Sequence, residues 1–200
     1  MFTGLIQSVG KVVSKHQKGG DLQFVIETHF HDMTEVQLGD SIAINGVCLT
    51  VTTINNSQVS VDVSVETIQK TDVSNWQLGT QLNLEKSLTL KDKLGGHMVS
   101  GHVDAMAECV SIEASARSTV YQFSVPSALD KYIVKKGSLA ISGVSLTVNN
   151  IEDCVVSVNL IPHTIENTNL GLIETGDKVN IEIDTIARYV EKMLNTQAHS

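Results

Sequence analysis

An internal repeat constrains this chain of 200 residues more than any other feature. Residues 41–51 read SIAINGVCLTV and residues 138–148 read SLAISGVSLTV, an offset of 97 at which eight of eleven positions are identical. β-Branched and apolar residues dominate both copies, and Gly46 and Gly143 permit a tight bend. Each copy therefore predicts two short β-strands joined at its glycine. Cys48 in the first copy matches Ser145 in the second, which suggests two related sites that differ in chemistry.

The same offset extends over most of the chain. Residues 1–6 align with 98–103, residues 62–67 with 159–164, and Gly79, Asn83 and Glu85 with Gly176, Asn180 and Glu182. The copies contain no net insertion, so both halves should share one fold. In the first half the pattern predicts strands at 8–14, 21–28, 41–44, 47–54, 58–63 and 81–85, turns at 18–20 and 55–57, and short helical turns within 30–38 and 66–70.

Six short strands in each half favour a closed barrel over an open sheet, because closure removes unpaired edges. We therefore expect an all-β chain of two tandem homologous six-stranded Greek-key β-barrels, residues 1–97 and 98–184, joined at 88–94, plus a C-terminal α-helix. Residues 185–196 carry apolar side chains at helical spacing, and Asp184 or Thr185 could cap that helix. We expect another subunit to cover this stripe, since small closed barrels offer little groove of their own. Residues 198–200 are expected to fray.

Composition excludes several classes of partner. The chain has 14 Lys and Arg against 22 Asp and Glu, a formal net charge of −8, and no basic run. This disfavours nucleic acid and anionic membranes. No secretory signal or apolar stretch of membrane-spanning length is seen, and the three cysteines have no C-x-x-C spacing. We expect reduced thiols and a cytoplasmic location.

Several phrases together resemble the riboflavin synthase family. They are 1–4 (MFTG), both copies of GV(C/S)LTV, 94–97 (LGGH) running into 100–104 (SGHVD), 160–164 (LIPHT) and 179–184 (VNIEID), in order and at the repeat offset. The resemblance covers essentially the whole chain. It implies two six-stranded barrels, a C-terminal helix, and a homotrimer held partly by that helix.

The resemblance also implies a reaction. Two molecules of 6,7-dimethyl-8-ribityllumazine exchange a four-carbon unit, and they leave as riboflavin and 5-amino-6-ribitylaminouracil, with no metal or organic cofactor. Each barrel would hold one lumazine, and the site would form between the N-terminal barrel of one subunit and the C-terminal barrel of a neighbour. Two copies of one barrel suit two identical molecules with opposite roles, because fixed orientation supplies a large share of the acceleration.

Two side chains lead the catalytic candidates. Cys48 could contact or activate the acceptor ring, although a lone cysteine is more commonly a small buried hydrophobe. Its mismatch with Ser145 and the resemblance favour the site. His102 stands where the first half has Leu5, and it could move protons, including one from the ring methyl at C7. The alternative is a histidine bonded within a turn after Gly101.

Other candidates are weaker. Ser145 and Thr147 match Cys48 and Thr50, and strand alternation places each pair on one face, so both members lie in a site or neither does. Ser41 is a candidate of the same kind, with local strand hydrogen bonds as the alternative. Asp184 could orient His102, stabilise a cationic intermediate, or cap the helix. The six catalytic candidates are Cys48, His102, Ser145, Thr147, Asp184 and Ser41.

A ribityl chain is a row of hydroxyls, which suits the backbone, hydroxyl and carboxylate groups after matching strands. The substrate-binding residues expected in the first half are Gly4, Leu5, Ile6, Cys48, Leu49, Thr50, Asp62, Val63, Ser64, Val65, Glu66 and Thr67. Those expected in the second half are Gly101, His102, Val103, Lys136, Ser145, Leu146, Thr147, Asn159, Leu160, Ile161, Pro162, His163, Thr164 and Ile165. For Lys136 the alternative is an ordinary exposed lysine. His29 and His31 lack a third ligand at a recognised spacing, so no metal is expected.

A second function remains open, that of a non-catalytic relative. The lumazine protein of luminous bacteria carries a bound lumazine or flavin as an antenna, and such a binder needs one good site only. Here all the catalytic candidates are present and both halves keep the full repeat phrase, which favours the enzyme.

Overall fold

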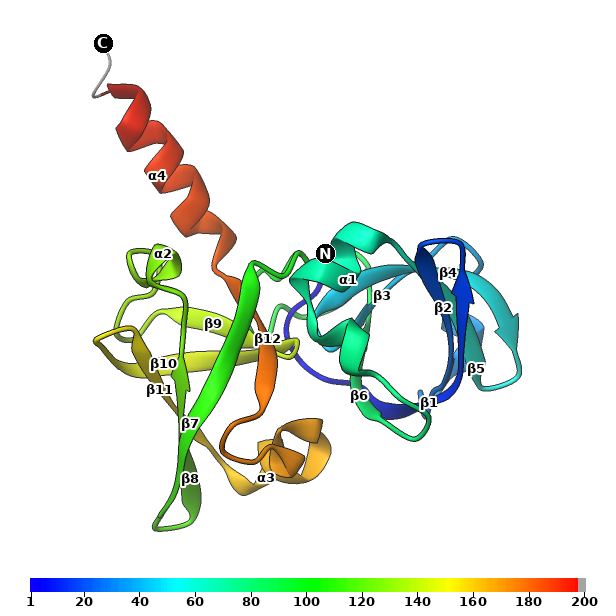
Figure 1. Cartoon of the computed structure of the whole chain (residues 1–200), viewed down its shortest axis with the longest axis horizontal. Coiled ribbons are helices and arrows are strands. Elements are labelled where there is room, and N and C mark those ends of the chain that lie inside the picture. The colour runs from blue at the N-terminus through cyan, green and yellow to red at the C-terminus, as the bar shows by residue number, and fades with distance from the viewer. Residues whose placement is uncertain (198–200) are drawn as a thin grey trace.

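The computed structural model describes residues 1–197, so the fraying expected at 198–200 lies outside the described residues. Two closed antiparallel barrels lie side by side, and one helix projects away from them (Figure 1). Around the first barrel the strand order is β1-β2-β5-β4-β3-β6, with β6 paired to β1. The strands are β1 (Ser8–Lys18), β2 (Asp21–Glu27), β3 (Ser41–Ile44), β4 (Val47–Asn55), β5 (Gln58–Val63) and β6 (Gln81–Lys86).

The second barrel repeats the arrangement. Its strands are β7 (Ala105–Ser115), β8 (Ser118–Ser124), β9 (Ser138–Ile141), β10 (Val144–Glu152), β11 (Val155–Leu160) and β12 (Lys178–Ile183). The order β10-β11-β8-β7-β12-β9 is that of the first barrel under the repeat. Both predicted six-stranded barrels are confirmed. β1 runs on to Lys18, beyond the predicted 14, because its far end stays paired with β2 as far as Asp21.

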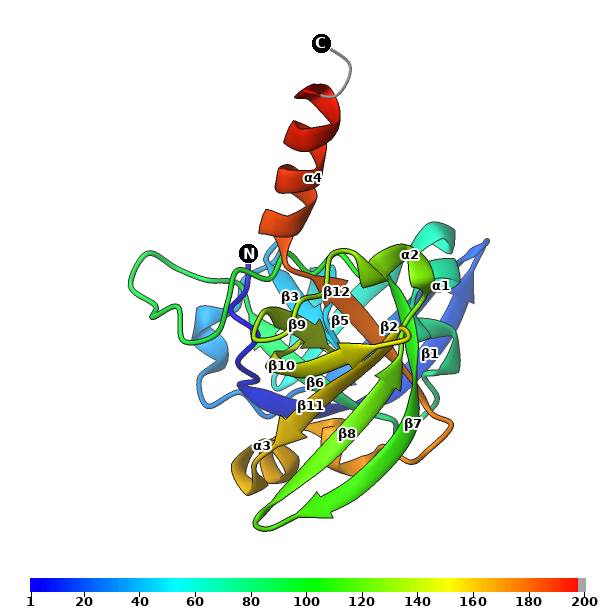
Figure 2. The same cartoon turned by 90° about the vertical axis from the view of Figure 1, so that its left-hand side faces the viewer.

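Short helices connect the strands. They are η1 (Met33–Glu35), α1 (Val65–Lys70), η2 (Asp72–Asn75), α2 (Ser127–Asp130), α3 (Pro162–Asn167) and η3 (Asn169–Leu172). Those at 33–35 and 65–70 confirm the two helical turns predicted in the first half, whereas the one at 72–75 was not predicted. The last helix, α4 (Thr185–Gln197), extends away from both barrels in two perpendicular views (Figure 2). No helix among residues 1–197 is both long and apolar enough to span a membrane.

Strand alternation decides which side chains fill each barrel. In β4, Val47, Leu49 and Val51 are buried in the first core, while Cys48 is half-buried and Thr50 exposed. In β10, Leu146 is buried in the second core, while Thr147 is exposed. Strands β4 and β10 thus direct alternate apolar side chains into the cores, and Cys48, Thr50 and Thr147 to the outer faces.

The halves are joined by two leading segments, residues 1–6 and 98–103, which cross between the barrels. Phe2 is fully buried and exchanges two backbone hydrogen bonds with Val99, at 2.8 and 3.1 Å. Ile6 packs against the core of the second barrel, and Val103 packs against the core of the first. Each half therefore covers the other, which ties the two barrels into one body.

A buried polar network adds to this junction. Asn180 Nδ2 donates to the carbonyl of Asn45 at 2.9 Å, and Asn83 Nδ2 donates to the carbonyl of Ser142 at 2.9 Å, a pair related by the repeat. Asp72 accepts hydrogen bonds from Asn180 Nδ2 at 2.7 Å, Trp76 Nε1 at 3.0 Å and Asn45 Nδ2 at 3.1 Å. Burial raises the pKa of Asp72, and these three bonds act against that rise.

Candidate functional site

Two matched sets of polar side chains lie on the outer faces of the barrels. The N-terminal strip comprises Ser41, Cys48, Thr50 and Asp62, and the C-terminal strip comprises Ser138, Ser145, Thr147 and Asn159. Within each strip β-pairing sets neighbours side by side: Ser41 lies opposite Thr50, and Ser138 lies opposite Thr147. The burial pattern of β4 and β10 alternates as expected, so residues 48 and 50 share one face, and so do residues 145 and 147.

The leading segments run over these strips. The carbonyl of Gly101 accepts a hydrogen bond from Cys48 N at 2.8 Å, and the carbonyl of Gly4 accepts one from Ser145 N at 2.8 Å. A Cβ on Gly101 would lie 2.6 Å from Cys48 Cβ, and one on Gly4 would lie 2.5 Å from Ser145 Cβ. Both glycines have positive φ, +80° and +75°, so no other residue fits there without strain. Gly101 thus packs against Cys48, and His102 is the next residue in the sequence.

Two buried glutamates hold the leading segments in place. Glu182 accepts from Ser100 N at 2.7 Å, Ser100 Oγ at 2.6 Å and Gly101 N at 2.9 Å. Glu85 makes the matching bonds to Thr3 N, Thr3 Oγ1 and Gly4 N at 2.6, 2.7 and 2.9 Å. Burial raises the pKa of Glu85, against the lowering by these donors. Neither glutamate was among the expected site residues, although their match at the repeat offset is visible in the sequence.

A histidine outside the expected set completes the C-terminal strip. His97 is 9 % exposed, its Nδ1 lies 2.7 Å from Ser145 Oγ, and its backbone N–H donates to Thr3 O at 3.2 Å. Its Nε2 is buried without a hydrogen-bond partner in the described part of the chain. Burial lowers the pKa of His97, and the negative charge of Asp184 partly opposes this. The phrase LGGH marked His97 as part of a pattern, but the repeat gave it no counterpart.

Asp184 and Lys136 have clear structural surroundings. Asp184 Oδ1 accepts from Ile186 N at 2.9 Å, so the helix-capping interpretation is confirmed. The geometry gives no support for Asp184 orienting His102, whose backbone N–H donates to Ser100 Oγ at 3.3 Å. Lys136 is exposed, at a positive φ of +69°, and its N–H donates to Val148 O at 2.8 Å.

The other expected binding residues divide by burial. Leu49, Val63, Leu146 and Leu160 point into the barrel cores, so only their backbone groups can face a ligand. The segments after β5 and β11 are exposed at helix starts. Ser64 Oγ accepts from Thr67 N to cap α1, and Asp62 Oδ1 accepts from Gln23 Nε2 at 2.8 Å. Residues exposed along these two segments are Asp62, Ser64, Val65, Glu66, Asn159, Ile161, Pro162 and His163.

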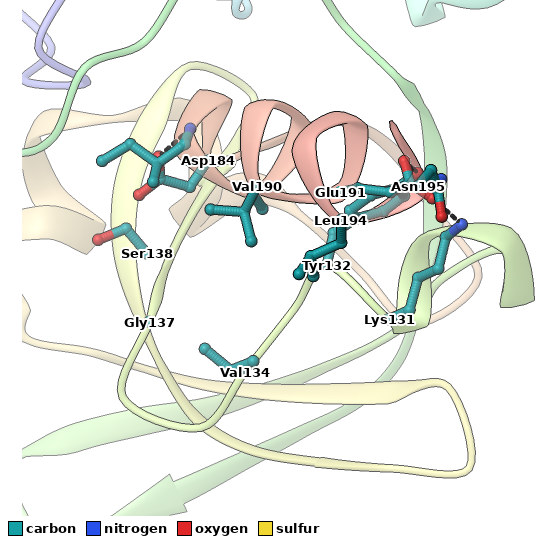
Figure 3. Close-up of a pocket in the computed structure, with 12 residues that line it drawn as sticks. Lys131, Tyr132, Val134, Gly137, Ser138, Asp184, Val190, Glu191, Leu194 and Asn195 are labelled. Carbon is teal, nitrogen blue, oxygen red and sulfur yellow. Dashed lines mark hydrogen bonds and ion pairs between the residues drawn. The ribbon is translucent and has the colours of Figure 1, made fainter. Parts of the chain in front are cut away.

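A cavity of about 610 Å³ lies apart from most of these residues, between α4 and the second barrel (Figure 3). Val190 and Leu194 of α4 line one side, and Tyr132, Val134 and Gly137 line the other. Of the expected site residues only Asp184 borders it, with Ser138 beside it. We base the candidate site on the two strips, because they carry the matched polar groups and the close approaches at Gly4 and Gly101.

Comparison with known proteins shows the family to which this chain belongs. The family model described as the lumazine binding domain matches twice, at residues 3–87 and 100–184. Riboflavin synthase of Photobacterium leiognathi is 41% identical over 199 residues, which cover 100% of this chain and 91% of that protein. Riboflavin synthase of Bacillus subtilis (strain 168) is 40% identical over 195 residues, covering 98% and 90%. The chain belongs to the riboflavin synthase family. The resemblance inferred from the sequence is therefore confirmed, and so is the assignment to an enzyme family.

Two solved structures share the fold of this chain. The structure of LumP complexed with riboflavin has a TM-score of 0.85 at 25% identity, covering 92% of this chain and 99% of that one. LumP complexed with 6,7-dimethyl-8-(1′-D-ribityl)lumazine has a TM-score of 0.83 at 24% identity, which speaks for the fold. The enzymes are closer in sequence than LumP, which favours the enzyme.

Proposed function

We propose that this chain converts two molecules of 6,7-dimethyl-8-ribityllumazine into riboflavin and 5-amino-6-ribitylaminouracil by transfer of a four-carbon unit. The observation that carries the proposal is the pair of strips, which share one strand framework. They differ in that Cys48 matches Ser145, and His102 matches Leu5, at the repeat offset. Two identical substrates need matched pockets, and their opposite roles need different polar groups. The duplicated barrel supplies both.

The residues take the following roles in this proposal. His102 is exposed at the N-terminal strip and moves the proton at the ring methyl. Cys48 and Ser145 contact the two ring systems, and Thr50 and Thr147 stand next to them on the same faces. The ribityl chains lie along 62–67 and 159–165, where exposed polar groups follow β5 and β11. Residues 1–97 and 98–184 then each bind one lumazine.

The site forms where the N-terminal strip of one subunit meets the C-terminal strip of its neighbour in a homotrimer. Support comes from α4, which leaves Ile186, Tyr189 and Met193 64, 68 and 68 % exposed. Apolar side chains exposed along one helix favour association with another subunit. The enzyme acts in the cytoplasm, in keeping with the free thiols of Cys48, Cys109 and Cys154.

Direct turnover tests the reaction. Purified protein is mixed with 6,7-dimethyl-8-ribityllumazine, with no added metal or cofactor, and absorbance and riboflavin fluorescence are followed. We expect one riboflavin for every two lumazines consumed. Tight binding without consumption would instead favour an antenna protein, and absence of binding would contradict the proposed ligand.

A further inference from the structure

We infer that His97 is a positioning residue that turns Ser145 into a committed hydrogen-bond donor toward the lumazine held by the C-terminal barrel. The inference deepens the proposed function and rests on it for the identity of the ligand. It starts from a single contact, the 2.7 Å separation of His97 Nδ1 and Ser145 Oγ.

The surroundings of the imidazole fix which nitrogen carries the proton. Nε2 is buried and has no hydrogen-bond partner among residues 1–197, and Asp184, whose Oδ1 accepts from Ile186 N, makes no hydrogen bond to it. A buried N–H without an acceptor is rarer and more costly than a bare acceptor atom. A neutral imidazole therefore keeps its hydrogen on Nδ1 and donates it to Ser145 Oγ.

This donation decides what Ser145 can offer a ligand. With one lone pair of Oγ engaged by His97, the hydroxyl hydrogen is free to turn outward from the half-buried Ser145. The carbonyl oxygens and ring nitrogens of a lumazine are acceptors for it. Ser145 itself is held tightly, because a Cβ on Gly96 would lie 2.8 Å from Ser145 Cβ and 2.9 Å from Oγ.

The arrangement exists in one half only. Cys48 stands at the position that matches Ser145, and among residues 1–197 no histidine side chain is hydrogen-bonded to it, whereas Ser145 has His97. Among the described residues no side chain donates to Cys48 Sγ, and Cys48 meets Gly101 through its backbone N–H, which donates to the Gly101 carbonyl at 2.8 Å, and through its Cβ. His97 thus adds a difference between the two lumazine pockets that the strips alone do not contain.

The tautomer is tested directly by NMR on the whole protein. Long-range ¹H–¹⁵N spectra of protein labelled with ¹⁵N-histidine are recorded near neutral pH, and His97 is assigned by its loss in His97→Asn. We expect hydrogen on Nδ1, and signals that move in Ser145→Ala. Hydrogen on Nε2 would overturn the inference. Because this readout needs no turnover, failure of the proposed reaction is seen separately, as wild-type protein that leaves lumazine unchanged.

Kinetics test the consequence. His97→Leu removes the donor, whereas an Asn amide can donate from about the place of Nδ1. We expect kcat/KM to fall about tenfold in His97→Leu and to recover to within about threefold in His97→Asn. Adding His97→Leu to Ser145→Ala should cost no further activity, since both act through one hydroxyl. The matched control is His16→Leu, which removes an exposed histidine 2.7 Å from Ser14 Oγ and should leave the rate unchanged. A folded His97→Leu with wild-type kinetics, or His97→Asn as slow as His97→Leu, would overturn the inference.

Discussion

At the scale of single residues, the proposed reaction assigns proton transfer to His102 at the N-terminal strip. Proton transfer by a positioned side chain contributes about 10²- to 10⁴-fold to a rate. We therefore expect His102→Ala to lower kcat about 100-fold or more while the dissociation constant for riboflavin stays within about threefold. Steady-state kinetics and fluorescence titration measure the two quantities, with His31→Ala, in an exposed loop, as control. Equal losses in rate and binding would make His102 a ligand contact only.

The same expectation applies to Cys48, whose substitution by serine makes the first strip resemble the second. Cys48→Ser should slow turnover far more than it weakens lumazine binding. The substitution should leave the packing of Gly101 against Cβ undisturbed, because the hydroxyl is smaller than the thiol. Turnover and lumazine binding are compared with those of the wild type at the same protein concentration.

Candidate site residues can be identified from the sequence where the two copies of the repeat differ. Cys48 against Ser145 and His102 against Leu5 stand out because each pair occupies one position of a duplicated frame. His97 could not be found that way, since no counterpart exists for comparison. Glu85 and Glu182 did match, but their bonds to Thr3 and Ser100 span 82 positions and are visible only in the folded chain.

At the scale of elements, the leading segments depend on their glycines. Gly101→Ala places a methyl group 2.6 Å from Cys48 Cβ at a φ of +80°. Positive φ and crowding together should lower the free energy of unfolding by about 2 to 5 kcal/mol. Gly79→Ala is the matched control, because its φ is +87° and nothing lies within 4 Å of the added methyl. There we expect a loss of about 1 kcal/mol. Urea unfolding compares them, and equal losses would contradict close packing at Gly101.

Helix α4 is the element on which assembly should depend. Truncation after Asp184 removes the exposed apolar side chains of residues 186–194 and should leave both barrels folded, because their cores lie wholly within residues up to Ile183. We expect the sedimentation mass to fall from trimer toward monomer while the far-ultraviolet circular dichroism of the barrels persists. Lys192→Ala, a change at an exposed polar position of α4, is the control. An unchanged mass after truncation would count against the helix.

The elements themselves follow from the sequence more fully than their contacts do. Alternating apolar residues and paired glycines suffice to predict twelve strands and two closed barrels. The crossing of Ile6 and Val103 to the opposite barrels was not predictable, because a leading segment is equally apolar whichever core it covers. The cavity between α4 and the second barrel likewise differs from the expectation that a small closed barrel offers little groove to the helix.

At the scale of the whole molecule, the junction between the barrels should respond to pH through Asp72. Its pKa is raised in the folded state from an ordinary value of 3.8, chiefly by burial. As pH rises through and above that value, the unfolded carboxyl ionises first, so folding loses stability. The free energy of unfolding of the wild type relative to Asp72→Asn should therefore fall between about pH 4 and about pH 7. Urea unfolding across this range measures it. If the bonds from Trp76, Asn45 and Asn180 outweighed burial, the difference would grow with pH instead.

The proposed pairing of strips between subunits leads to the last prediction. Thr50 and Thr147 are exposed at matching positions of the two strips, so a large side chain at either should block one strip without disturbing a core. Thr50→Trp and Thr147→Trp should each be inactive alone. A site needs an intact N-terminal strip from one subunit and an intact C-terminal strip from its neighbour. In each trimer that contains both variants one of the three contacts meets this condition, so about one third of the sites are restored.

Coexpression of the two variants with different affinity tags, followed by purification through both tags, yields mixed trimers for assay. Trimers of each variant carrying both tags serve as controls for the purification. If each site were instead built from the two strips of one chain, every chain in the mixture would carry one blocked strip, and activity would stay at the level of the separate variants. Recovery of activity on mixing therefore distinguishes a site shared between subunits from one completed within a single chain, by a measurement that depends on the assembled molecule alone.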